Sequence, residues 1–319
     1  MKKIPLILNL LLVTTFLRAQ DVDKLIGEDY VRKVITKLTS DEMMGRSAAT
    51  PKYTEKAVQF IESQFKETGL APLEGLTDFR QEFVEKRWPG VKMYNVVGVL
   101  KGKSKPDEMV IFSAHYDHIG ILDPVAGDSI ANGADDDASG TTAVITLAKY
   151  FKEINNNERT LVFVAFSAEE IGGAGSRYFS EKVDPAKVVA MFNIEMIGKP
   201  SKWGQNSAFI TGFERSDFGT ILQKNVTGTK FQFHPDPYPK EELFYRSDNA
   251  RLAMKGVPAH SISTDEIDID QLYHTVNDEV ETLDMKNIVA AIKAIALGSK
   301  TIVSGEDTPT RIPPLKKTN

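Results

Sequence analysis

Two short runs of this chain are apolar at almost every position, and this pattern constrains the fold more than any other. The runs are Val110–Ala114 and Leu161–Phe166, and neither alternates between apolar and polar residues. Strands of this kind are covered by helices on both faces, as in parallel sheets. The segment between them, 138–153, has apolar residues at helical spacing, at Ala143, Val144, Leu147, Ala148 and Phe151. A strand, a helix and a strand in this order predict a β-α-β unit with parallel strands.

Further strands and helices are expected on either side of this unit. Helices are predicted over residues 22–38 and 51–69, the second with Thr50 as N-cap, Pro51 in its first turn and Gly69 at its end. Strands are predicted over residues 80–86, 94–101, 109–114, 160–167, 188–196, 208–211 and 258–263. The Pro-rich segment 232–246 is expected to be an irregular loop. We therefore predict an α/β fold of three layers, α/β/α, with a central mixed, mostly parallel sheet.

The first 19 residues resemble a secretory signal peptide. Lys2 and Lys3 precede a mostly apolar run over residues 4–13, and the segment ends at Ala19, where Leu17 and Arg18 make an imperfect small-residue cleavage site. The alternative is a retained N-terminal anchor, but the run is short for a bilayer span. We expect an exported protein, periplasmic or secreted, without a stable membrane anchor.

The remaining chain is expected to form one domain. Residues 20–300 are predicted to be a single catalytic domain, and the polar, Pro-rich residues 301–319 a poorly ordered tail. The net charge of -5 becomes -8 when the signal peptide, with two lysines, one arginine and no acid, is removed. An acidic chain without basic clusters gives no indication of nucleic-acid binding. We expect a monomer.

Histidines and carboxylates stand where the predicted strands end, and the chain has no cysteine. In open α/β sheets, ligands bind beyond the carboxyl ends of the strands, so these side chains are expected to meet. Imidazole and carboxylate donors without thiolate are typical of catalytic sites for zinc or similar divalent ions. The candidates are His115 and Asp117 after one strand, Glu169 and Glu170 after the next, Glu195 at the end of a third, Asp135, Asp136 and Asp137 before a helix, and His274 near the end.

The order of these motifs resembles the co-catalytic di-zinc aminopeptidases, a group with bacterial leucyl aminopeptidase, aminopeptidase S and glutamate carboxypeptidase among its members. The motifs are His-x-Asp, Gly-Ala-Asp-Asp-x-Ala-Ser-Gly, Glu-Glu, an acid after an apolar strand and a late His, within residues 38–283. The resemblance implies two Zn²⁺ ions per chain. It implies that His115 and Glu195 bind one ion, that Glu170 and His274 bind the other, and that Asp136 bridges them.

The resemblance also implies roles for residues that are not metal ligands. Asp117 would support His115, and Glu169 would be the general base that takes a proton from the attacking water. A cis peptide bond is implied between Asp136 and Asp137. Tyr245 is predicted as an oxyanion donor, with a pocket-wall aromatic as the equal alternative, and His118 is expected at the pocket wall or beside a ligand.

Two positions differ from the pattern of the family. Glu195 stands where members often have Asp, and Asn249 follows Ser247 and Asp248 where many members have His. A longer carboxylate keeps the charge and the donor atom, so we expect metal binding to persist. Asp248 is given only a supporting role, with a helix N-cap segment as the alternative.

The predicted function is an exported zinc aminopeptidase that removes N-terminal residues from peptides with a free amino terminus. One alternative is a glutaminyl cyclase-like zinc aminoacyltransferase, which would use one zinc ion. Another is a dipeptide carboxypeptidase, for which Arg246 and Arg251 are the only basic residues near the candidate loop. A non-catalytic binding protein is the third, and the complete set of ligands together with Glu169 argues against it.

Overall fold

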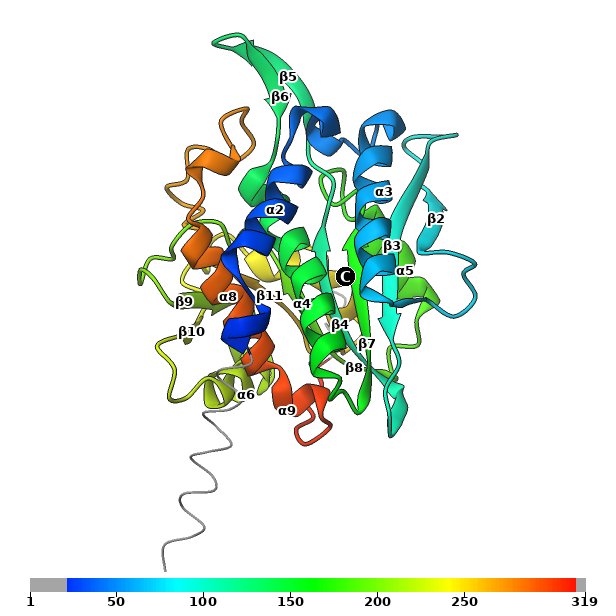
Figure 1. Cartoon of the computed structure of the whole chain (residues 1–319), viewed down its shortest axis with the longest axis vertical. Coiled ribbons are helices and arrows are strands. Elements are labelled where there is room, and N and C mark those ends of the chain that lie inside the picture. The colour runs from blue at the N-terminus through cyan, green and yellow to red at the C-terminus, as the bar shows by residue number, and fades with distance from the viewer. Residues whose placement is uncertain (1–21, 314–319) are drawn as a thin grey trace, which may run out of the picture.

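The structure is a computed structural model that describes residues 22–313. The predicted signal peptide, residues 1–19, lies outside the described residues. One large sheet runs through the molecule, with helices on both of its faces (Figure 1). No helix within residues 22–313 is both long enough and apolar enough to cross a bilayer.

The large sheet is mixed, and its centre is parallel. Its strands follow the order β1-β3-β7-β4-β8-β11-β9-β10, and β2 pairs with β3 beside this path. The strands are β1 Ala71–Pro72, β2 Arg80–Val84, β3 Lys92–Leu100, β4 Lys105–His115, β7 Arg159–Phe166, β8 Val188–Ile194, β9 Ser207–Ile210, β10 Gln232–Pro235 and β11 Ala259–Ser263. A separate antiparallel hairpin, β5 Gly120–Val125 and β6 Asp128–Ala131, projects at the top of Figure 1.

The two apolar runs of the sequence form neighbouring central strands. β4 pairs in parallel with β7, so that Phe112 lies opposite Phe163, and β4 pairs in parallel with β8 on its other side. β8 in turn pairs in parallel with β11. Because parallel strands end at the same edge, the residues that follow β4, β7 and β8 come together there.

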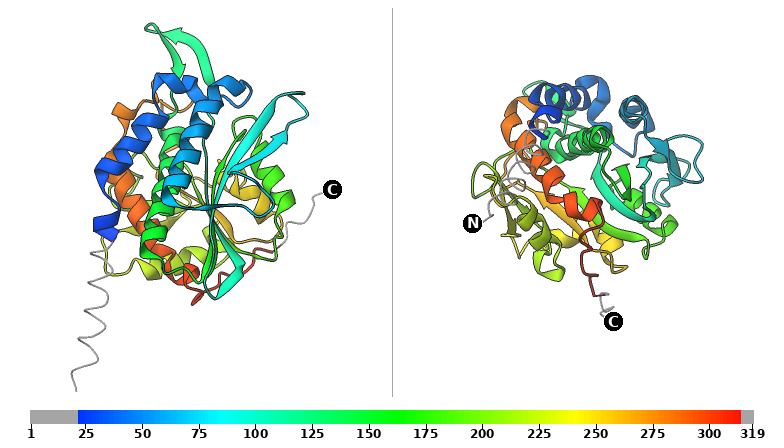
Figure 2. Two further views of the ribbon diagram at one scale, coloured as in Figure 1. Left: turned by 45° about the vertical axis from the view of Figure 1, so that its right-hand side comes forward. Right: turned by 60° about the horizontal axis from the view of Figure 1, so that its bottom comes forward.

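Helices cover the two faces of the sheet unequally. One face carries the larger group of helices, which stand together in Figure 2: α2 Glu28–Leu38, α3 Pro51–Thr68, α4 Gly140–Ile154, α6 Phe218–Asn225, α8 Met285–Gly298 and α9 Lys300–Val303. The other face carries α5 Ala174–Lys182 and α7 Asn249–Ala253. The three predicted layers are therefore present.

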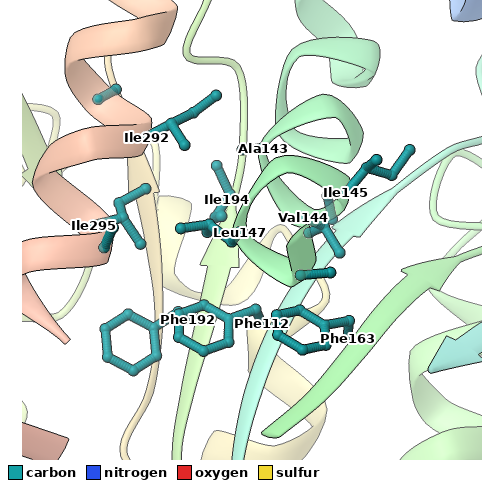
Figure 3. Close-up of a cluster of buried hydrophobic side chains, with 14 of the residues drawn as sticks. Phe112, Ala143, Val144, Ile145, Leu147, Phe163, Phe192, Ile194, Ile292 and Ile295 are labelled. Carbon is teal, nitrogen blue, oxygen red and sulfur yellow. The ribbon is translucent and has the colours of Figure 1, made fainter. Parts of the chain in front are cut away.

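The larger core lies between the central strands and helices α4 and α8. Phe112 stacks on Phe163 and Phe192 from the neighbouring strands, with ring centroids 5.6 and 4.8 Å apart. Leu147 of α4 and Ile295 of α8 close over this row of rings (Figure 3). All five side chains are fully buried, so the core fixes the strand ends that carry the candidate site.

Several local features differ from the sequence-based predictions. The helix predicted over residues 22–38 is interrupted at Gly27, whose backbone is extended, and continues as α2. Thr50 precedes α3 as predicted but makes no side-chain cap bond. The predicted loop 232–246 contains a short strand, β10, which pairs in parallel with β9. Pairing with β9 supplies backbone partners that the sequence pattern of this segment does not reveal.

The predicted tail is packed against the domain as far as residue 313, so the prediction of a poorly ordered segment from Thr301 is wrong for residues 301–313. Thr301 to Val303 belong to α9, and Ile312 is 1% exposed within the smaller core. The buried guanidinium of Arg159 donates hydrogen bonds to the carbonyls of Ile302 and Asp307. These contacts order a segment whose composition alone suggested disorder.

Candidate metal centre

The predicted ligands meet at the carboxyl edge of the central strands. His115 is the last residue of β4, Glu170 follows β7 by four residues, and Glu195 directly follows β8. Asp136 lies in the irregular helical turn Ala134–Ser139 that leads into α4. His274 comes from the long loop after β11. Five segments, distant in the sequence, thus supply one site.

Three of these side chains form a first group of donors. Nε2 of His115 lies 3.0 Å from Oε1 of Glu195 and 3.2 Å from Oδ1 of Asp136. Both His115 and Asp136 are buried, and Glu195 is half-buried. On the other ring nitrogen, Nδ1 of His115 lies 3.0 Å from the backbone oxygen of Asp117. This contact fixes the ring so that Nε2 faces the two carboxylates.

A second group forms around the other oxygen of Asp136. Nε2 of His274 lies 3.1 Å from Oδ2 of Asp136 and 3.0 Å from Oε2 of Glu170. Nδ1 of His118 approaches the same carboxylates, at 2.8 Å from Oε1 of Glu170 and 3.7 Å from Oδ2 of Asp136. Asp136 therefore presents one oxygen to each group.

Both groups fit a divalent metal ion. Zinc binds imidazole nitrogen and carboxylate oxygen at about 2.0–2.2 Å, and two donors on one tetrahedral ion then lie roughly 3.3 Å apart. The nitrogen-to-oxygen distances of 3.0–3.2 Å within each group are close to that spacing. Burial opposes ionisation of Asp136, yet hydrogen bonds from His115 and His274 hold the pKa of this carboxyl well below its usual range. Asp136 is thus a carboxylate in the metal-free protein.

Glu169 stands beside both groups without belonging to either. Its backbone N–H donates to Oδ1 of Asp117 at 3.1 Å, which ties the end of β7 to the end of β4. Burial, reinforced by the nearby acids Glu195, Asp248 and Glu170, raises the pKa of Glu169 well above its ordinary value, although His115 opposes this. A carboxylate with a raised pKa is suited to accept and release a proton.

A cavity of about 610 Å³, including the part open to solvent, adjoins the two groups. Glu169, Glu170 and Glu195 line it on the metal side. Its other walls are mainly Met196, Phe209, Thr211, Leu243, Arg246, Ser247, Ser261, Ser263, Asp265, Ile267 and Tyr273. The carboxylates therefore face a space that can hold a substrate side chain.

The peptide bond between Asp136 and Asp137 is cis, as the sequence resemblance implied. The model of peptidase family M28 matches residues 95–298, which contain every candidate ligand. The chain belongs to peptidase family M28.

Curated relatives of this M28 chain are peptidases. A probable leucine aminopeptidase of Trichophyton verrucosum is 29% identical over 224 residues, 66% of this chain and 56% of the relative. Aminopeptidase YwaD of Bacillus subtilis is 22% identical over 236 residues, 68% of this chain and 46% of the relative. The chain spans about half the length of these curated relatives.

Solved structures share the M28 fold over most of the chain. A zinc aminopeptidase of Bacillus subtilis has a TM-score of 0.71 at 15% identity, with 89% of this chain and 97% of that chain covered. The glutaminyl cyclase of Porphyromonas gingivalis has a TM-score of 0.68 at 15% identity, covering 87% and 99%. At these identities the likeness establishes the fold alone.

Tyr245 is the predicted site residue that the structure leaves apart from the others. It follows Phe244 on the loop beside the cavity but is not among the lining residues, and it is 37% exposed. Its ring packs edge-to-face on Phe244, and Arg215 lies over it. The role of Tyr245 as an oxyanion donor stays a prediction.

Some residues of the site carried little signal in the sequence. His118 is predicted at the pocket wall or beside a ligand, and its ring lies beside the proposed ligand Glu170. Tyr273 lines the cavity and stacks on His274 with ring centroids 3.9 Å apart. Ser247 donates a hydrogen bond to Oε2 of Glu195, so this longer side chain is supported on its second oxygen. The His-x-Asp-His spacing around His118 was the one signal that could have indicated its contact.

Proposed function

We propose that this chain is a zinc-dependent aminopeptidase that hydrolyses the first peptide bond of substrates with a free amino terminus. The observation that carries the proposal is that the two carboxylate oxygens of Asp136 face different groups of donors. Its Oδ1 faces His115, and its Oδ2 faces His274. A carboxylate shared in this way is suited to hold two ions close together. The family membership and the aminopeptidase relatives support the same activity.

The proposed ligands are His115, Glu195 and Asp136 for one zinc ion and His274, Glu170 and Asp136 for the other. Bound zinc supplies a water molecule with a lowered pKa and polarises the scissile carbonyl. Glu169 would be the general base, accepting a proton from the attacking water and releasing it to the leaving amine, since it lines the cavity and is not needed as a ligand. Asp117 orients His115 through its backbone oxygen.

The surroundings of the site favour a cationic substrate terminus. Glu169 and Glu195 face the cavity, and Asp265 and Glu170 also line it, with Arg246 as the one basic lining residue. Arg246 is itself paired with Glu241. A protonated α-amine is attracted to such a wall, whereas an amide in the middle of a peptide gains nothing there.

We further propose that the protein is exported, in accordance with Lys2, Lys3 and the apolar run that follows them. Hydrolysis would then act on peptides outside the cytoplasm. The test is fractionation of expressing cells with an antibody to the chain, together with N-terminal sequencing of the recovered protein. Recovery of the full-length chain from the cytoplasm would refute export.

Cyclisation of an N-terminal glutamine is the second candidate, because the fold is also that of a glutaminyl cyclase. The first group of donors, His115, Glu195 and Asp136, favours hydrolysis because it completes a site for a second ion. A cyclase needs only one ion.

The experiment is a panel on the purified protein. Zinc content is measured by mass spectrometry, followed by hydrolysis of free and N-acetylated aminoacyl amides and cyclisation of a glutaminyl peptide. We expect two zinc ions per chain and hydrolysis of the free substrates only. Equal rates on free and acetylated substrates would refute the aminopeptidase. Cyclisation without hydrolysis would replace it with the second candidate.

A further inference from the structure

Asp278 makes an unusual set of contacts with the turn that carries Asp136. Its carboxylate accepts the backbone N–H of Asp135 at 3.0 and 3.1 Å and that of Asp136 at 3.1 Å. The backbone oxygen of Asp278 accepts the N–H of Ala134 at 3.0 Å. Three consecutive N–H groups thus point at one residue that is 1% exposed. Such a run of N–H groups forms an anion-binding concavity.

The same turn is held from its other side by Arg46. This buried guanidinium donates to the backbone oxygens of Asn132 at 2.6 Å and Gly133 at 2.9 Å. Arg46 therefore binds the carbonyls at the start of the turn, and Asp278 binds the N–H groups of the residues that follow. With both sides of the turn fixed, the direction of the Asp136 side chain is fixed as well.

Asp278 also belongs to the loop that carries His274. Residues 264–279 contain no helix or strand, and His274 is the most exposed of the proposed ligands, with 37% of its side chain exposed. Short turns connect the two residues, through bonds from the N–H of Thr275 to Leu272 and from the N–H of Asp278 to Thr275. The anchored end of this loop is therefore only four residues from the imidazole.

We propose that Asp278 is the positioning residue of the second metal site, the one formed by Asp136, Glu170 and His274. It joins the turn of Asp136 to the loop of His274 while touching neither a metal donor atom nor the substrate cavity. The first site depends on it less, because His115 and Glu195 stand at strand ends that Asp278 does not contact. This inference rests on the proposed metal centre.

The test compares metal binding by the wild-type chain and by Asp278→Asn. An asparagine keeps the shape but places an N–H₂ group against the N–H groups of the turn, so at least one of the bonds is lost. Stepwise titration of the metal-free proteins with Zn²⁺ by calorimetry, and with Co²⁺ by absorption spectroscopy, reports the two sites separately. We expect the second ion to bind 10- to 100-fold more weakly, the usual effect of losing an outer-shell partner, with a much smaller change for the first.

Asp284→Asn is the matched control. The carboxylate of Asp284 likewise accepts two backbone N–H groups, those of Lys286 at 2.9 Å and Asn287 at 3.2 Å, at the start of α8. The substitution is chemically the same but lies outside the metal-bearing segments. We expect it to leave both affinities within about threefold of wild type, a change of less than about 0.7 kcal/mol.

Two results would overturn the role of Asp278: unchanged binding of the second ion, or equal weakening of both ions. If Asp278→Asn does not fold, hydrogen exchange of the metal-free wild-type chain decides instead. Segments 134–136 and 275–278 should then be protected together, and free exchange of 275–278 alone would refute the proposal. A wild-type chain that binds fewer than two ions would refute the proposed metal centre itself, which is a separate result.

Discussion

The carboxylate of Asp136 has one oxygen near His115 and the other near His274, so a single side chain connects both groups of donors. Replacing it would remove a ligand from each group, whereas replacing either histidine would affect one group. The number of ions that the site can hold therefore depends on this residue more than on any other. The charge of the site also depends on it, since hydrogen bonds from both histidines keep it ionised.

Under the proposed function, replacement of Glu169 should separate metal binding from catalysis. We predict that Glu169→Gln lowers kcat by about 10²- to 10⁴-fold, the usual contribution of a general base, because glutamine cannot accept the proton. Zinc content should stay at the wild-type value, since Glu169 belongs to neither group of donors. Steady-state kinetics and metal analysis on the same preparation measure both effects.

Glu82→Gln is the control for this prediction, because Glu82 is an exposed residue of β2 paired with Lys92. It should leave kcat unchanged. Full turnover by Glu169→Gln would remove Glu169 from the mechanism, and loss of zinc from that variant would assign it to the ligands.

The buried imidazole of His260 makes the free energy of unfolding depend on pH. Burial lowers the pKa of His260 to about 4, and its ring bonds to Ser216 and to the backbone oxygen of Thr211. The unfolded chain, with a histidine pKa of about 6.5, binds the proton more strongly. Stability from this group is therefore complete above about pH 6.5 and is lost as the pH falls towards 4.

For the metal-free protein, this difference corresponds to a loss of about 2 kcal/mol in the free energy of unfolding between pH 7 and pH 5. Urea unfolding at the two pH values measures it. His260→Gln should be less stable at pH 7 and should show a pH dependence smaller by that amount. An unchanged pH dependence in the variant would contradict the shifted pKa.

The residues of the site differed in how far the sequence could predict them. His115, Glu170 and Glu195 follow apolar strands, so their donor type and position both pointed to the carboxyl edge of the sheet. Asp278 and Arg46 act on backbone groups 142 and 87 residues away in the sequence. No periodicity or motif spacing reports such contacts, because they depend on how loops pack.

At the scale of elements, the start of α4 is packed against the end of β8 with no space for a side chain. A Cβ atom at Gly140 would lie 2.2 Å from the backbone oxygen of Ile194 and 2.5 Å from Oδ1 of Asp137. That carboxylate oxygen accepts the N–H of Gly140 and the N–H of Met196. Gly140 therefore sets the distance between the helix and the strand on which the site is built.

We predict that Gly140→Ala lowers the free energy of unfolding by about 1–3 kcal/mol, the usual cost of overpacking. Alanine is the better helix former by about 1 kcal/mol, so helix propensity alone predicts the opposite sign. Gly27→Ala is the control, because its φ is -102° and a Cβ atom there meets nothing within 4 Å. Chemical denaturation of both variants distinguishes the two effects, and a stabilised Gly140→Ala would contradict the packing.

The elements themselves were predicted best where burial is complete. β4 and β7 are apolar on both faces, and their predicted bounds agree with the structure to within a few residues. β10 and the hairpin of β5 and β6 were missed because they are short and partly exposed, with prolines at 124 and 235. Their pairing partners, and not their own composition, make them strands.

At the scale of the whole molecule, the C-terminal segment completes the packing around Arg159. This side chain is 1% exposed, and its guanidinium donates to residues 302, 307 and 308. Ile312 fills a place in the smaller core beside Val257 and Ala259. The segment 305–313 is thus part of the domain, although it contains no helix or strand.

We predict that truncation after Ser304 lowers the free energy of unfolding by roughly 3–5 kcal/mol. The truncation removes Ile312, whose burial contributes about 2 kcal/mol. It also removes the partners of the buried Arg159 guanidinium at residues 307 and 308. Truncation after Pro313 keeps every contact described above and is the matched control. Thermal and chemical unfolding of both proteins measures the difference, and equal stability would show that the segment does not contribute.

The layers and the parallel centre of the sheet were predictable from the sequence, whereas the direction of some strands was not. The β-α-β unit predicted a parallel centre, which is present, and the three layers follow from its strands being covered on both faces. The antiparallel pairing of β3 with β7 and of β11 with β9 could not be predicted, since strand direction at the edges depends on how long connections cross the sheet.

The bonds from the N–H groups of Asp135 and Asp136 to Asp278 span more than 140 residues of sequence. A growing chain that ends before residue 274 lacks one proposed ligand, and one that ends before residue 278 also lacks the group that orients Asp136. No shorter N-terminal fragment contains a finished site. A fragment that ends before residue 274 still carries the first group of donors, His115, Asp136 and Glu195, so only the second group requires that synthesis be nearly complete before it can hold an ion.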